Sequence, residues 1–236
     1  MNKKQEKKLE ISEIDLEDEH QLEFHIKQIK KQEIKEYFKI NIFRISYLGM
    51  LTSINLIFAL IGNHILSLIP LWQFYVIEIT FLTYILMWVC INGFYALLMV
   101  TPLTWIRIVF GGQVEWIGLL SMNLSDLTSL AIFIFFMWIL RTKIWKNKYK
   151  SLFIKIFICL IIAIIWSIIW NLFANFVFIF PLYSTHWSIP IETLKNWTSA
   201  GIVALFNIIK YSINFAVFVS ILKPVKIIMS KHINKS

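Results

Sequence analysis

The sequence has few charged residues, and three long stretches have none at all. Of its 236 residues 16% are charged, whereas a soluble domain carries about 25%. The stretches without any charge contain 33, 28 and 36 residues, at positions 45–77, 79–106 and 156–191. A helix of about 20 apolar residues crosses the hydrocarbon core of a bilayer. This pattern excludes a water-soluble enzyme and predicts an all-α integral membrane protein.

The groups needed for catalysis are also sparse. Beyond residue 44 there are only four acids, Glu78, Glu115, Asp126 and Glu192. None of them forms the close pair used in acid–base catalysis. The sequence contains no G-x-x-x-x-G-K-[ST] loop for ATP, no H-E-x-x-H zinc motif and no G-x-S-x-G nucleophile motif. The two cysteines lie in apolar runs without metal-ligand spacing. We therefore expect a protein that is not an enzyme and holds no metal or cofactor.

Positive charge is confined to short clusters beside the apolar runs. The formal net charge is +9, yet residues 1–44 hold ten basic and ten acidic residues, so the excess belongs to the rest of the chain. Most of it lies in 141–150 and 223–235. Basic residues beside membrane spans mark cytoplasmic loops because they resist translocation, and they contact anionic lipid. We expect these clusters to set the topology at the membrane, and we expect no nucleic-acid partner.

Six transmembrane helices fit the sequence, at 41–61, 72–91, 94–110, 117–140, 152–180 and 198–222. A five-helix alternative merges the second and third, but Asn92-Gly93 is a strong turn signal. Merging them would also place Lys39 and Arg44 on the opposite side from the basic loop 141–150, against the positive-inside rule. With six helices both termini are cytoplasmic.

Three parts of the chain are expected on this basis. They are a charged cytoplasmic N-terminal extension (1–38), a six-helix membrane domain (39–228) and a basic C-terminal tail (229–236).

Polar residues fall inside three of the expected spans: Asn123 and Asp126 in the fourth, Asn171 and Asn175 in the fifth, and Asn207, Lys210 and Asn214 in the sixth. A lysine near the centre of a membrane helix costs about 2.5–3.5 kcal/mol on insertion scales, so Lys210 needs a cavity or a partner. Two interpretations are open. One is a polar ligand pocket open to the outside. The other is hydrogen bonding between helices, with Lys210 and Asp126 as a buried ion pair.

Four short stretches occur in order within these spans: Arg44-Ile-Ser-Tyr-Leu-Gly-Met-Leu-Thr-Ser53, Gly118-Leu-Leu-Ser-Met-Asn123, Asn175-Phe-Val-Phe-Ile-Phe-Pro-Leu-Tyr183 and Phe206-Asn-Ile-Ile-Lys210. They resemble motifs of the substrate-binding S components of the energy-coupling-factor (ECF) vitamin transporters, in particular the riboflavin-specific branch. The resemblance covers residues 41–228 and leaves the N-terminal extension outside.

The resemblance implies a membrane subunit that captures a vitamin from outside and delivers it inward. A transmembrane coupling subunit and two cytoplasmic ATPase subunits would complete the ABC-type importer and hydrolyse the ATP. By motif, the vitamin would be bound by Asn123, Asn175, Tyr183, Asn207 and Lys210.

The first motif implies a contact with the coupling subunit. Gly49 and Ser53 lie four residues apart, and small residues at this spacing allow another helix to approach closely. The resemblance implies that these two residues face the coupling subunit.

The resemblance implies riboflavin as the transported ligand. Aromatic walls with a few amides are compatible with its flat ring edged with carbonyls and nitrogens, and a cationic Lys210 would equally serve a carboxylate vitamin. Residues 75–79 lack the acid-rich segment with proline that is usual in the riboflavin branch. Folate, pantothenate and pyridoxine therefore stay open. Outside transport, the alternatives are an integral-membrane enzyme acting on lipid and a non-catalytic scaffold. The abundance of Ile, Lys, Asn and Phe is typical of an AT-rich genome, which favours a bacterial plasma membrane.

Overall fold

A computed structural model describes residues 27–29, 31–32, 34–64, 78–110, 115–140 and 149–233. The chain separates into two units, one ending at Ile42 and the other beginning at Phe43. In the first unit, residues 34–38 are helical, and the rings of Tyr37 and Phe38 meet edge to face. Residues 1–26 of the expected N-terminal extension lie outside the described residues.

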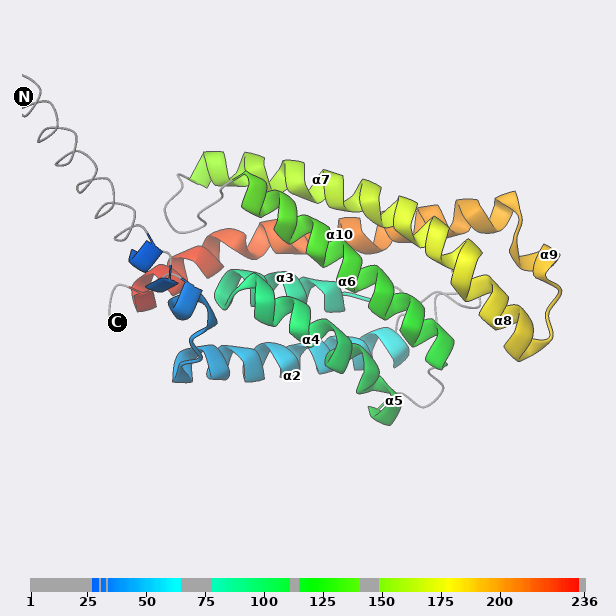
Figure 1. Ribbon diagram of the computed structural model, residues 1–236, viewed down its shortest axis with the longest axis horizontal. Coiled ribbons are helices and arrows are strands. Elements are labelled where there is room, and N and C mark those ends of the chain that lie inside the picture. The colour runs from blue at the N-terminus through cyan, green and yellow to red at the C-terminus, as the bar shows by residue number, and fades with distance from the viewer. Residues whose placement is uncertain are drawn as a thin grey trace, which may run out of the picture. The chain divides into compact units, whose positions relative to one another are not determined.

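The second unit is built of helices, and the described residues contain no strand (Figure 1). In chain order the helices are α2 (Ile42–His64), α3 (Thr80–Cys90), α4 (Gly93–Trp105), α5 (Arg107–Phe110), α6 (Trp116–Ile139), α7 (Tyr149–Ala174), the π-helix η2 (Asn175–Ile179), α8 (Phe180–Trp187), α9 (Ile191–Leu194) and α10 (Trp197–Ile233).

Four helical segments are long and apolar enough to cross a membrane: Ile42–Gly62, Trp116–Ile139, Leu152–Trp187 and Trp197–Val225. Two shorter apolar segments, Thr80–Cys90 and Gly93–Val109, lie between the first and second of these. The outer face of α7 carries exposed apolar side chains at helical spacing, including Ile154, Phe157, Ile161, Ile165 and Ile169. The chain is therefore an all-helical, multi-pass membrane protein.

Two helices run past the ends expected from the sequence. The fifth span, expected to end at residue 180, continues through η2 and α8 to Trp187. The sixth was expected to end at residue 222, where lysines begin, but α10 continues past Pro224 to Ile233. Lysine is a good helix former, so a helix can continue where its apolar stretch ends. Residues 229–233, expected in a separate tail, are helical in consequence.

The turn predicted at Asn92-Gly93 is confirmed. Helix α3 ends at Cys90 and α4 begins at Gly93, with Asn92 Oδ1 accepting a hydrogen bond from the Tyr95 N–H at 2.9 Å. This is the usual N-cap arrangement. A Cβ on Gly93 would lie 3.0 Å from the Ile134 side chain, so glycine lets α6 pack close to the turn. One continuous helix over this segment, as in the five-helix alternative, is excluded.

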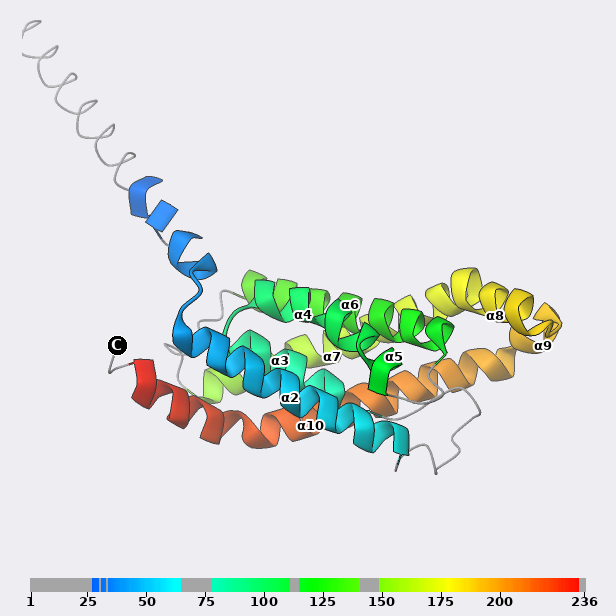
Figure 2. The same ribbon diagram turned by 90° about the horizontal axis from the view of Figure 1, so that it is seen from below.

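Within the second unit, α6, α7 and α10 pack together, α3 packs against α10, and α4 packs against α3 and α6 (Figures 1 and 2). At one end, α3 turns into α4, α6 ends, α7 begins and α10 ends. The opposite end, which we call the α8–α9 end, also holds α5 and the beginnings of α6 and α10.

A polar layer separates two apolar clusters along α6, α7 and α10. The larger cluster includes Phe133, Leu160 and Phe218, and the smaller one, at the α8–α9 end, includes Ile117 and Val203. Along each of these helices, buried polar residues lie between the positions that belong to the two clusters. They form the polar layer: Ser125, Asp126, Ser129, Ser167, Asn171, Asn175, Asn207, Lys210 and Asn214. Buried polar groups are costly unless they have partners, so this layer is where a site is expected.

Candidate functional site

A pocket lies beside the polar layer, toward the α8–α9 end. Its empty space measures about 770 Å³ when the solvent in its open mouth is counted. Its lining comes from α6 and α10 and from the continuous segment α7–η2–α8–α9: Gly118, Ser121, Met122, Ser125, Asn171, Asn175, Ile179, Phe180, Tyr183, Leu194, Phe206, Asn207 and Lys210. Apolar and aromatic walls with a few placed polar groups are typical of ligand sites.

Local helix geometry directs these side chains to one place. On α6 the lining positions 118, 121, 122 and 125 are spaced by three and four residues, which puts them on one helix face. Next to Asn171 and Asn175 the helix widens into the π-helix η2, where the Phe180 N–H donates to the Asn175 carbonyl five residues back. Such π-turns are frequent at functional sites.

Four of the five residues that the motifs predicted as ligand contacts line this pocket: Asn175, Tyr183, Asn207 and Lys210. The fifth, Asn123, is not among the lining residues. Its Oδ1 accepts a hydrogen bond from Thr101 Oγ1 of α4 at 3.2 Å. Successive helix residues are turned by about 100°, so position 123 lies off the lining face of α6 and faces α4.

The three asparagines of the pocket use their amide nitrogens within the chain. Asn175 Nδ2 donates to the Asn171 carbonyl and Asn207 Nδ2 donates to the Val203 carbonyl, both at 2.7 Å. Asn171 Nδ2 donates to Ser125 Oγ at 2.8 Å. Within the described part of the chain, none of the three carboxamide oxygens accepts a hydrogen bond. Each of these oxygens is an acceptor available to a ligand.

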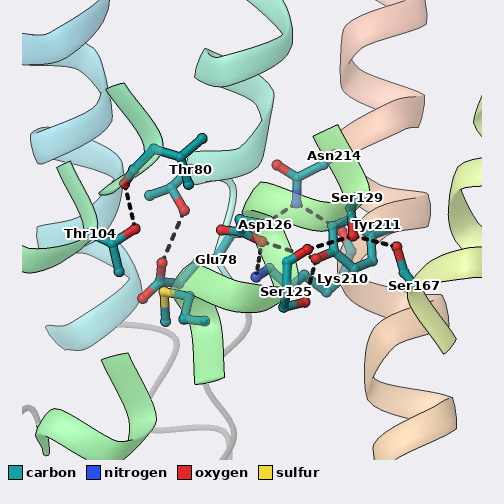
Figure 3. A network of polar contacts seen from close by, with 12 residues as sticks. Glu78, Thr80, Thr104, Ser125, Asp126, Ser129, Ser167, Lys210, Tyr211 and Asn214 are labelled. Carbon is teal, nitrogen blue, oxygen red and sulfur yellow. Dashed lines mark hydrogen bonds and ion pairs between the residues drawn. The ribbon is translucent and has the colours of Figure 1, made fainter. Parts of the chain in front are cut away.

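Lys210 forms a buried ion pair with Asp126, as Figure 3 shows. Its Nζ donates to Asp126 Oδ1 at 2.7 Å, and Tyr211 Oη donates to the same oxygen at 3.0 Å. Asp126 is 0% exposed and Lys210 3%. The ion pair of the second interpretation is therefore present, and Lys210 also lines the pocket.

A second buried ion pair, between Glu78 and Arg107, was not predicted from the sequence. Arg107 Nη1 of α5 donates to Glu78 Oε2, and Thr80 Oγ1 donates to the same oxygen at 3.0 Å. Both charged side chains are 2% exposed. A Cβ on Gly62 would lie 2.9 Å from Glu78 Cγ, so a glycine of α2 leaves room for this carboxylate. The sequence signal for this pair is that Glu78 and Arg107 are the charged residues at the two ends of a 28-residue uncharged run.

Asn214 connects the two ion pairs. Its Oδ1 accepts the Leu82 N–H of the first turn of α3 at 2.8 Å, and the same N–H donates to the Ile79 carbonyl at 3.3 Å. Its Nδ2 donates to the carbonyls of Glu78 and Lys210, both at 2.8 Å. One amide of α10 thus holds the beginning of α3 beside Lys210 (Figure 3).

Comparison with known proteins leaves the family undecided. No protein-family model matches the sequence, and no curated protein is detectably similar to it. Among the described residues, no group of three or more His, Cys, Asp or Glu side chains could hold a metal ion. The function is therefore inferred from the motifs and from the geometry of the pocket.

Proposed function

We propose that this chain is the substrate-capturing S component of an ECF-type ABC importer and that it binds riboflavin in the pocket beside the polar layer. The observation that supports this best is the convergence of the motif residues. Asn175 and Tyr183 come from one motif and Asn207 and Lys210 from another, yet all four line one pocket. Residues that only joined helices would have no reason to share a cavity.

The chemistry of the lining suits a flavin. The pyrimidine edge of its ring carries an N–H between two carbonyls. The carboxamide oxygens of Asn175 and Asn207 can accept from ring or ribityl donors, and Lys210 Nζ can donate to a carbonyl. Phe180, Tyr183 and Phe206 supply aromatic surface for the ring faces.

A flavin bound during expression tests the proposal. The full chain, expressed alone in a host that makes riboflavin and purified in detergent, should carry an equimolar amount of flavin, measured by visible absorbance. Asn207→Leu should lose the flavin because it removes a pocket acceptor. Asn123→Leu is the matched control, since Asn123 does not line the pocket, and it should keep the flavin.

A colourless protein that also leaves the fluorescence of added riboflavin unquenched would contradict the flavin assignment. Folate, pantothenate and pyridoxine would then be screened by thermal shift on the same preparation. If Asn123→Leu lost the flavin and Asn207→Leu kept it, Asn123 would be a ligand contact, as its motif implies.

We further propose six membrane crossings, with both termini and the basic clusters on the cytoplasmic side of a bacterial plasma membrane. The short α3 and α4 would cross with help from flanking residues, since a full crossing needs about 20 residues. In support, Arg44 lies near the beginning of α2, Lys155 near the beginning of α7 and Lys223 in the last part of α10. These helix ends lie at the end of the second unit opposite α8 and α9 (Figure 2). Residues 141–148 of the basic loop lie outside the described residues.

Cysteine labelling of intact cells checks this topology. In a variant whose two native cysteines are replaced by alanine, Trp187→Cys at the α8–α9 end should react with a membrane-impermeant maleimide. Ile227→Cys, beyond the apolar part of α10, should react only after the cells are opened. Both positions are about half exposed, at 51% and 48%, so their reactivity can be compared. The reverse pattern would contradict cytoplasmic termini.

The coupling subunit would pack on α2. Gly49 and Ser53 lie on an exposed face of this helix, and nothing lies within 4 Å of a Cβ built on Gly49. Ser53 Oγ donates to the Gly49 carbonyl at 3.0 Å, so the hydroxyl is satisfied within the helix. The Ser53 hydroxyl therefore needs no partner from outside the helix, which suits close packing of two membrane helices.

A further inference from the structure

The pocket has one charged lining residue among the described residues, and its charge is already balanced. Lys210 contacts Asp126 at 2.7 Å, and Tyr211 donates a second hydrogen bond to the same carboxylate oxygen. Asp126 itself does not line the pocket. It therefore acts on a ligand through Lys210, by removing the positive potential that an isolated ammonium group would create in a site of low dielectric constant.

The other charges near the pocket do not restore a positive potential. Arg107 is paired with Glu78. Glu115, at the beginning of α6, interacts with Tyr183 of the lining. The charges of these five groups, Lys210, Asp126, Arg107, Glu78 and Glu115, thus sum to no excess of positive charge.

The polar lining of the pocket offers three carboxamide oxygens as acceptors. The carboxamide oxygens of Asn171, Asn175 and Asn207 accept nothing within the described residues, while their nitrogens donate within the chain. A phosphate or carboxylate has only acceptor oxygens. Brought into this pocket, it would meet other acceptors and a lysine that is already paired.

We infer that Asp126 sets the charge selectivity of this pocket: by neutralising Lys210, it makes the pocket a site for uncharged ligands that donate hydrogen bonds and rejects their phosphorylated or carboxylate-bearing forms. The inference rests on the proposed function in so far as the pocket binds a vitamin. It does not require that the vitamin be riboflavin. Asp126 is a specificity residue that acts through its partner, so its test must measure charge preference as well as affinity.

The experiment compares two matched pairs of probes on the purified full chain, riboflavin with riboflavin 5′-phosphate and pantothenol with pantothenate. Riboflavin 5′-acetate controls for added size without charge. We expect the wild type to bind the neutral member of a pair at least about tenfold more tightly than the anion, because nothing offsets the cost of desolvating the anion. Asp126→Asn should move this ratio toward the anion by about tenfold or more, since it leaves Lys210 unpaired.

Two further variants keep the test independent of the stability of Asp126→Asn. Asp126→Asn/Lys210→Met removes both charges and should return the ratio to a preference for the neutral probe. Ser121→Lys leaves the Asp126–Lys210 pair intact and adds an unpaired cation to the lining. It should gain binding of the anionic probe in the same direction as Asp126→Asn.

The outcomes separate this inference from the flavin assignment. Preference for pantothenol over pantothenate with no flavin binding supports the inference and overturns riboflavin as the ligand. Equal or tighter binding of an anion by the wild type overturns the inference and leaves vitamin capture standing. An unchanged ratio in both Asp126→Asn and Ser121→Lys also overturns it. Binding of none of the probes overturns both proposals.

Discussion

Lys210→Met is expected to lower the free energy of unfolding by about 3–5 kcal/mol, because it leaves a buried carboxylate without its partner. Asp126 is 0% exposed, and after the substitution its remaining hydrogen bond would come from Tyr211 Oη. The measurement is equilibrium unfolding of the purified protein in mixed micelles with increasing SDS, followed by tryptophan fluorescence.

Asp126→Asn/Lys210→Met is the control for this prediction. Replacing both members of a buried ion pair with neutral residues of similar size is often close to neutral in stability. We therefore expect the double variant to recover most of the loss. A double variant as unstable as Lys210→Met would show that the cost came from packing and not from the stranded charge. The same comparison decides whether a loss of ligand binding in Lys210→Met reflects a lost contact or a disturbed fold.

Arg107→Met should lower the free energy of unfolding by a similar amount, about 3–5 kcal/mol. It strands Glu78, whose carboxylate would keep the hydrogen bond from Thr80 Oγ1. Glu78 adjoins the beginning of α3, which Asn214 holds against α10. The damage should therefore appear at α3, as faster hydrogen exchange of the amides in its first turns than in the middle of α6.

Glu78→Gln/Arg107→Met should restore slow exchange in α3, and Arg107→Lys should give an intermediate loss because it keeps the charge and loses the planar fork of the guanidinium. If Arg107→Met unfolded at the same SDS concentration as the wild type, the assignment of this pair as a structural element would be contradicted. Exchange that rises equally in all helices would contradict its local role at α3.

The helices of the second unit could be predicted from the sequence because their signals are local. Long uncharged runs mark the spans, and Asn92-Gly93 marks the turn between α3 and α4. The extension of α10 past Pro224 was missed because a prediction from hydropathy ends where the lysines begin. Proline lacks an amide hydrogen and favours a break, yet a long helix can continue past it with a bend.

The residues of the candidate site were predicted in part. Residues close together in the sequence leave a visible pattern, whereas contacts between separate helices do not. Asn207 and Lys210 share a helix face at a spacing visible in the sequence. The Glu78–Arg107 pair depends on how α3 and α5 meet, and no local pattern encodes that. Asn123 was assigned by motif alone, and the direction of its side chain depends on the rotation of α6 against α4.

The π-helix η2 carries an implication for how this chain can change through insertion and deletion. A π-turn equals an α-helix with one extra residue, so its removal rotates everything that follows by about 100° relative to what precedes it. Asn171 lies before η2 and Tyr183 after it, and both now line the same pocket. Loss of one codon within Asn175–Ile179 would keep a continuous, membrane-compatible helix yet turn Tyr183 away from Asn171. The length of this segment is thus under a geometric constraint that substitution at any single lining residue would not reveal.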